Sequence, residues 1–214
     1  MLFDEINALF IHIPKTAGLS IEASLLQYCN GSLIGKHHNR YIDLPQNLID
    51  ENFTFSFVRN PWDRFVSYYH FIGPGAPIYP TRRTIHHYAR YVTNQYVYPK
   101  GHCYKNISFK EFVFDYLDSS HCPREIRYSL EWDLFDWLGN SKGEIELDFI
   151  GRFAELESDF KTLCEKLDIV HLPLPYANQT EHANYTNYYD SETRSHIAEK
   201  YSKEIEYFDF KFGD

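Results

Sequence analysis

Two segments of this chain change from an apolar strand pattern to an amphipathic helix pattern, and each change falls on a cation. The first runs from residues 7–13 through Lys15 into a helix pattern at 18–28. The second lies within residues 51–71 and passes through Arg59. Mostly continuous apolar runs are typical of strands that are covered on both faces, as in a parallel sheet. The two segments therefore predict an α/β protein with a cation at the end of each strand.

The second helix has clear start signals. Asn60 can cap it, Pro61 suits its first position, and Asp63 lies in the first turn, where the helix dipole favours an anion. Apolar residues then recur at helical spacing, which predicts a face packed against a core. These residues are Trp62, Phe65, Val66 and Tyr69.

Strand and helix patterns continue to alternate along the chain, which favours a mainly parallel sheet flanked by helices in three layers. Ser108 and Glu111 form a capping-box pattern, and Asp190 can cap the last helix. The length of 214 residues suits one domain over 1–214, with an insertion at about 72–130 that we expect to face the substrate. The further predicted elements are a helix at 108–119, a strand at 143–153, and helices at 156–167 and 190–208.

Composition narrows the classes of partner and compartment. A net charge of -9 would repel a long polyanion, so nucleic-acid binding is not expected. The N-terminus has neither a signal-peptide pattern nor a membrane-span pattern, and the four cysteines have no CxxC spacing. We expect a cytoplasmic protein with reduced thiols.

The segment "IPKTAGLS" has the parts of a phosphate-binding loop. Pro14 ends the strand, Gly18 allows the backbone to turn closely around an anion, and the helix that follows presents unpaired N-H groups. Lys15, Thr16 and Ser20 add further donors. The Walker pattern G-x-x-x-x-G-K-[ST] is absent, because the lysine precedes the glycine. The alternative is that Lys15 is a solvated surface charge.

Arg59 and Ser67 suggest a second anion site at the neighbouring strand end. An arginine there can bind phosphate through a charge-assisted fork, and Ser67 lies on the polar side of the same helix as Asp63. The alternative is that Arg59 pairs with a nearby carboxylate and that Ser67 faces water.

These residues resemble a known enzyme family. "IPKTAGLS" is similar to the 5'-phosphosulfate loop, and "FVRNPWDRFVSYY" to the 3'-phosphate segment, of sulfotransferases that use 3'-phosphoadenosine 5'-phosphosulfate (PAPS). The resemblance is to the carbohydrate-type group related to heparan sulfate 2-O-sulfotransferases and their bacterial relatives. It covers most of the chain outside 72–130 and implies a P-loop-like fold. Leu19 stands where the family often has threonine.

The resemblance also implies roles for individual residues. A histidine between the two motifs would be the catalytic base, and "GKHHNR" offers His37, which the family pattern G-K-H favours, and His38. Arg152 would bind donor or acceptor, or would tie its strand end to a carboxylate. The 3' phosphate would contact Arg59 and Ser67, and the 5' phosphosulfate would contact Lys15, Thr16, Ala17, Gly18 and Ser20.

The predicted reaction is transfer of a sulfuryl group from PAPS to an acceptor hydroxyl, on a carbohydrate or another polyhydroxylated compound, leaving 3'-phosphoadenosine 5'-phosphate (PAP). Lys15 would stabilise the charge that develops on the departing phosphate oxygen. A kinase-like phosphotransferase and a non-catalytic nucleotide- or glycan-binding module are the alternatives. No metal site is assigned, since the pairs His102-Cys103 and His121-Cys122 match no usual zinc spacing. The sequence does not indicate the oligomeric state.

Overall fold

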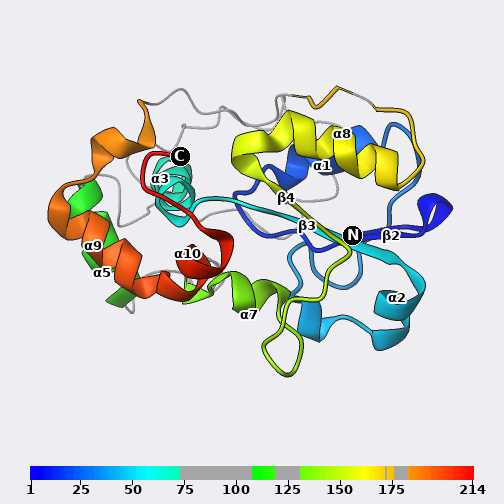
Figure 1. The fold of residues 1–214 in the computed structure, drawn as a ribbon, viewed down its shortest axis with the longest axis horizontal. Coiled ribbons are helices and arrows are strands. Elements are labelled where there is room, and N and C mark those ends of the chain that lie inside the picture. Colours follow the sequence, from blue (N-terminus) through cyan, green and yellow to red (C-terminus); the bar gives the residue numbers. More distant parts are fainter. Residues whose placement is uncertain (73–107, 119–130, 172, 176–182) are drawn as a thin grey trace.

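The computed structural model describes residues 1–72, 108–118, 131–171, 173–175 and 183–214 (Figure 1). Most of the predicted insertion at 72–130, with its histidines and cysteines, therefore lies outside the described residues. A sheet of four strands, in the order β1-β2-β3-β4, forms the centre of the described fold. The strands are β1 (Leu2–Phe3), β2 (Ala8–Phe10), β3 (Phe53–Val58) and β4 (Phe149–Arg152).

The sheet is mainly parallel, as the sequence predicted. β2, β3 and β4 are parallel neighbours, with Phe10 opposite Phe55 and Val58 opposite Arg152, while the short β1 is antiparallel to β2. Because parallel strands end at the same edge, the residues that follow β2, β3 and β4 lie close to one another.

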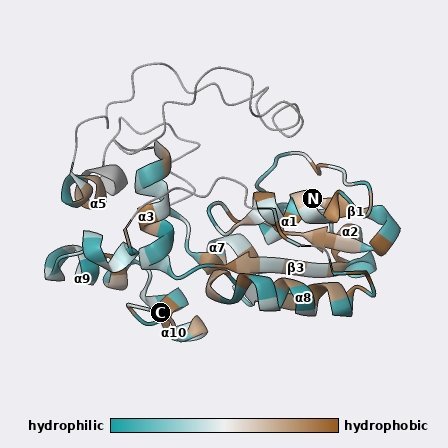
Figure 2. Cartoon of the chain, turned by 90° about the horizontal axis from the view of Figure 1, so that it is seen from above, coloured by the Kyte–Doolittle hydropathy of each residue, from teal (hydrophilic) through white to brown (hydrophobic). Residues whose placement is uncertain are grey.

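Helices cover both faces of the sheet (Figure 1). α1 (Gly18–Leu25) and α8 (Leu156–Lys166) pack on one face through buried residues that include Ile21 and Phe160. The other face is covered by residues around η2 (Tyr41–Asp43), α7 (Leu134–Leu138) and α10 (Ser202–Phe208). Hydrophilic and hydrophobic residues alternate along α8, as expected for a helix with one face on the core (Figure 2).

A third group of helices packs beyond the carboxyl ends of the strands. α3 (Pro61–Ile72), α5 (Phe109–Asp118) and α9 (Ser191–Lys200) share a core that contains Phe65, Phe112 and Ile197. The remaining described elements are η1 (Asp4–Ile6), α2 (Gln46–Glu51), η3 (Phe153–Glu155) and η4 (Tyr185–Tyr188). None of the described helices combines the length and the apolar character that crossing a membrane requires.

The predicted helix starts are confirmed. Asn60 Oδ1 accepts a hydrogen bond from the N-H of Trp62, and α3 begins at Pro61. Ser108 and Glu111 form the predicted reciprocal contacts, and Asp190 caps α9 together with Thr193. Local side-chain chemistry therefore determines where these helices begin.

Several predicted elements were too long, and the helix predicted at 18–28 ends at Leu25. The run at 7–13 pairs as a strand only over Ala8–Phe10, although Ile11 N-H still donates to Phe55 O. Of the strand predicted at 143–153, only Phe149–Arg152 pairs with β3. The single helix predicted at 190–208 is two helices that meet at Tyr201. Strand length depends on where a partner strand runs, which a local pattern does not contain.

Candidate active site

The loop after β2 has an unusual backbone. Lys15 and Ala17 both adopt positive φ angles, 69° and 67°, and flank Thr16. Such conformations are strained by roughly 1–3 kcal/mol for residues other than glycine, and they cluster at ligand sites. Thr16 is fully buried, and its hydroxyl donates to Ile13 O at 2.9 Å. The turn therefore leads directly into the amino terminus of α1 at Gly18, where backbone N-H groups can bind an anion.

Lys15 is packed against an aromatic ring. Its Nζ lies 4.1 Å from the centre of the Phe71 ring. Burial, and then the nearby Arg59 charge, together lower the pKa of Lys15 to about 8. No described carboxylate forms an ion pair with Lys15. Lys15 is partly buried, so it is not the solvated surface charge that the sequence analysis gave as the alternative.

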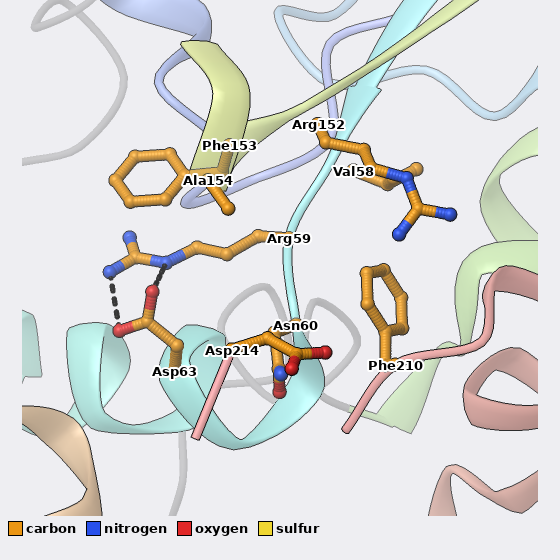
Figure 3. Close-up of a pocket in the computed structure, with 9 residues that line it drawn as sticks. All are labelled: Val58, Arg59, Asn60, Asp63, Arg152, Phe153, Ala154, Phe210 and Asp214. Atoms are coloured by element: carbon orange, nitrogen blue, oxygen red, sulfur yellow. Dashed lines mark hydrogen bonds and ion pairs between the residues drawn. The ribbon is translucent and has the colours of Figure 1, made fainter. Parts of the chain in front are cut away.

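Arg59 lies beside Lys15 at the end of β3. Its Nη1 donates to Lys15 O at 3.1 Å, so the loop after β2 meets the end of β3. Nε and Nη2 donate to the two carboxylate oxygens of Asp63 at 2.7 and 2.8 Å, and the guanidinium stacks 3.8 Å from the Phe153 ring centre (Figure 3). Arg59 therefore does pair with a nearby carboxylate, Asp63. The guanidinium of Arg59 has about five N-H donors, and acceptors on the described residues use three of them. Two N-H donors are left for an anion.

Ser67 and Arg152 lie near this junction. Ser67 is buried on α3, one turn after Asp63. The alternative in the sequence analysis, that Ser67 faces water, is therefore wrong. Arg152 Nη2 donates to Phe208 O at 2.6 Å, and its backbone N-H donates to Asp159. A pocket of about 50 Å³ has Arg59, Asp63 and Arg152 among its lining residues (Figure 3). It has room for a few water molecules.

His37 and His38 belong to a cluster that the sequence analysis did not anticipate. Glu22, on α1, is buried, and its two carboxylate oxygens contact His12 Nδ1 at 2.8 Å and His37 Nε2 at 2.9 Å. His38 Nδ1 contacts His12 O at 2.9 Å. We call His12, His37, His38 and Glu22 the histidine cluster. It lies next to the phosphate loop, because a Cβ on Gly18 would be only 2.0 Å from His12 Nε2.

The electrostatics of this cluster favour neutral His12 and His38 rings near one carboxylate. Burial lowers the pKa of His12, and burial together with the neighbouring histidines lowers the pKa of His38 well below its usual value. Burial would raise the pKa of Glu22, but contacts with His12 and then His37 outweigh it, so the carboxyl pKa is lowered. Glu22 therefore accepts hydrogen bonds from two histidines and determines which nitrogen of each ring carries the proton.

Sequence reasoning missed His12 and Glu22. His12 lies inside the first apolar strand pattern, and Glu22 lies between the apolar residues Ile21 and Leu25 of α1. The sequence did contain a signal for both residues, because each is an ionisable residue within an apolar pattern. Such residues are rarely buried without a partner.

Comparison with known proteins gives one family. A family model described as "Sulfotransferase family" matches residues 1–211. No curated protein and no solved structure shows significant similarity to the chain.

Proposed function

Because the chain belongs to the sulfotransferase family, we propose that it transfers a sulfuryl group from PAPS to an acceptor hydroxyl. One observation carries this proposal: the hydrogen bond from Arg59 Nη1 to Lys15 O joins the loop after β2 to the end of β3, and each of these segments has a cation followed by a helix amino terminus. A nucleotide with phosphates at both its 5' and 3' positions has the charge pattern that suits such a pair.

The residues present fit this donor. The turn through Lys15 and Ala17 and the amides at the start of α1 would hold the 5' phosphosulfate, with Thr16 and Ser20 shaping the turn. The two remaining N-H groups of Arg59 would hold the 3' phosphate, together with Ser67. Arg152 lies further along the same edge. We propose on this basis that the loop acts like a P-loop, although it lacks the Walker pattern.

PAPS supplies the activated sulfuryl group. Among the residues of the chain, we propose His37 as the base: its Nε2-H would donate to Glu22, which leaves Nδ1 to accept the proton of the acceptor hydroxyl. Glu22 would stabilise the imidazolium that results. Protonated Lys15 would stabilise negative charge on the departing phosphate oxygen. His38 is the second candidate base from the sequence and lies beside His37.

The acceptor and the setting are also proposals. We propose a carbohydrate or another polyhydroxylated compound as acceptor, with the insertion at 72–130 contributing to its recognition within a single domain over 1–214, and a cytoplasmic location. A labelled sulfate donor, incubated with the protein and with panels of glycans, glycolipids and small alcohols, tests this proposal. Label transferred to a hydroxyl compound is the expected result. PAP binding without transfer to any acceptor would instead favour the non-catalytic binding module, and transfer of phosphate from a nucleoside triphosphate would favour the kinase alternative.

A further inference from the structure

The three imidazole rings of the histidine cluster are arranged almost symmetrically. The centres of His12, His37 and His38 are 4.5–4.7 Å apart in every pair, and each pair of rings is inclined by 71–73°. One ring nitrogen from each histidine lies within 4.8 Å of the other two. One ring nitrogen from each of the three histidines therefore lies near the other two.

The partners of these rings determine where their lone pairs lie. His12 O can only accept a hydrogen bond, so His38 Nδ1 must donate to it. An ionised Glu22 can only accept, so His12 Nδ1 and His37 Nε2 must donate. In neutral rings, the protons are then all on the nitrogens that face these acceptors. The other nitrogens, including His37 Nδ1 and His38 Nε2, carry lone pairs.

His37 Nδ1 and His38 Nε2 are 3.4 Å apart. Two lone pairs at that distance cannot hydrogen-bond to each other, but one cation between them satisfies both. Two nitrogens that bind the same tetrahedral zinc ion at about 2.0–2.1 Å are about 3.4 Å apart. The observed spacing is therefore the spacing of two zinc ligands.

The surroundings complete this pattern. Histidines that bind metals almost always donate their other ring N-H to a carboxylate or a backbone carbonyl. Here Glu22 receives those bonds from His12 and His37, and His12 O receives the bond from His38. Imidazole ligands suit zinc and neighbouring divalent transition metals rather than Mg²⁺ or Ca²⁺.

We propose that His12, His37 and His38 form a binding site for a divalent transition-metal ion such as Zn²⁺, with Glu22 orienting the ligands and a fourth position open to water. Metal binding here does not depend on the proposed function. One consequence does rest on that proposal: coordination takes the lone pair that His37 needs as a base, so bound Zn²⁺ inhibits sulfuryl transfer.

Calorimetric titration of the full chain with Zn²⁺ alone tests the site. The expected result is one ion per chain, with affinity reduced at least tenfold in His38→Ala and about tenfold to a hundredfold in Glu22→Gln. Two controls should keep the unaltered affinity: His171→Ala, which changes an exposed histidine, and Cys103→Ser with Cys122→Ser, which removes the thiols considered in the sequence analysis. Equal Zn²⁺ affinity in the unaltered chain and in His38→Ala, or no binding to the unaltered chain, would overturn the proposal.

A second measurement does not depend on how well a variant folds. Co²⁺ added to the unaltered chain should give the visible absorption bands of a tetrahedral cobalt site, and Zn²⁺ should displace it and remove them. Octahedral cobalt spectra alone would contradict the three-histidine geometry. PAP affinity, measured on the same samples, separates the two proposals, because a chain that binds PAP but not Zn²⁺ retains the proposed donor site and lacks only the metal site.

Discussion

Two charged regions share the carboxyl edge of the sheet, and they are built in different ways. Lys15 lies in the loop between β2 and α1, Arg59 lies between β3 and α3, and the two cations contact the rings of Phe71 and Phe153. The histidine cluster instead joins the segment just after β2, helix α1 and the loop at 37–38 around one buried carboxylate.

The comparison separates two electrostatic tasks. Lys15 has a lowered pKa and no ion pair to a described carboxylate, so an anionic ligand would relieve the cost of its burial. In the histidine cluster, Glu22 already receives a hydrogen bond from each of two rings. The first region is thus arranged to receive negative charge, and the second to hold a proton or a cation at a defined nitrogen. If this division is correct, substitutions in the two regions should affect different measurements.

The largest effect is expected from His37→Ala. Loss of the proposed base should reduce kcat by about 10²–10⁴-fold, because positioned general bases contribute that much. PAP affinity should change little, since His37 contacts Glu22 and His38 rather than Lys15 or Arg59. Steady-state kinetics and calorimetry with PAP measure the two effects, with His171→Ala as the matched control. A kcat within about threefold of the unaltered enzyme would remove His37 from the reaction.

Lys15→Met should have the next largest effect on rate. The variant keeps much of the apolar stem beside Phe71 and removes only the charge. We expect kcat to fall by about 10²–10³-fold, the range for a lost transition-state donor, with a much smaller change in PAP affinity. Losses of similar size in turnover and in binding would mean that Lys15 binds the ground state and the transition state equally.

Arg59→Ala should mainly weaken binding. We expect the Kd for PAP to rise about tenfold to a hundredfold, because one charge-assisted phosphate contact is lost. Arg40→Ala is a close control: Arg40 also forms a bidentate pair, with Asp43, and its guanidinium stacks on Trp132 at 4.8 Å. Calorimetry that found the same PAP affinity for both variants would exclude Arg59 from the donor site.

The smallest expected effect is a pH dependence of PAP binding. The pKa of Lys15 is about 8 in the free protein, and a bound phosphate should raise it, so binding takes up a proton above pH 8. PAP affinity should therefore be constant below pH 8 and should fall by at most about tenfold per pH unit above it. Titrations from pH 7 to 9.5 in buffers of different ionisation enthalpy measure this uptake. Lys15→Met should lose the dependence, and a steep decrease that persists in that variant would assign the proton to another group.

Much of the fold could be predicted because it depends on local chemistry. The strand-helix order around Lys15 and Arg59, the caps at Asn60 and Asp190 and the capping box of Ser108 with Glu111 are all confirmed by the structure. Each of these features involves residues a few positions apart, whose interactions do not require knowledge of the rest of the chain.

The break at Tyr201 could not be predicted in the same way. The pattern at 190–208 favours one helix, but α9 ends at Lys200 and α10 starts at Ser202. Beyond the break, Glu204 is fully buried beside Arg64 of α3 and accepts a hydrogen bond from Leu134 N-H. The direction of α10 is thus coupled to partners about 70 and 140 positions away in the chain.

The amino-acid sequence by itself determined that a cation lies between each of two strands and the helix that follows it, because strand periodicity, Pro14, Pro61 and the caps act over neighbouring residues. Only the tertiary structure decided that Glu22 lies between His12 and His37 and that His38 lies against them. The physical reason is that a hydrogen bond requires two groups to approach within about 3 Å. For residues 10 to 26 positions apart, that approach depends on how the helix and the loop pack on the sheet.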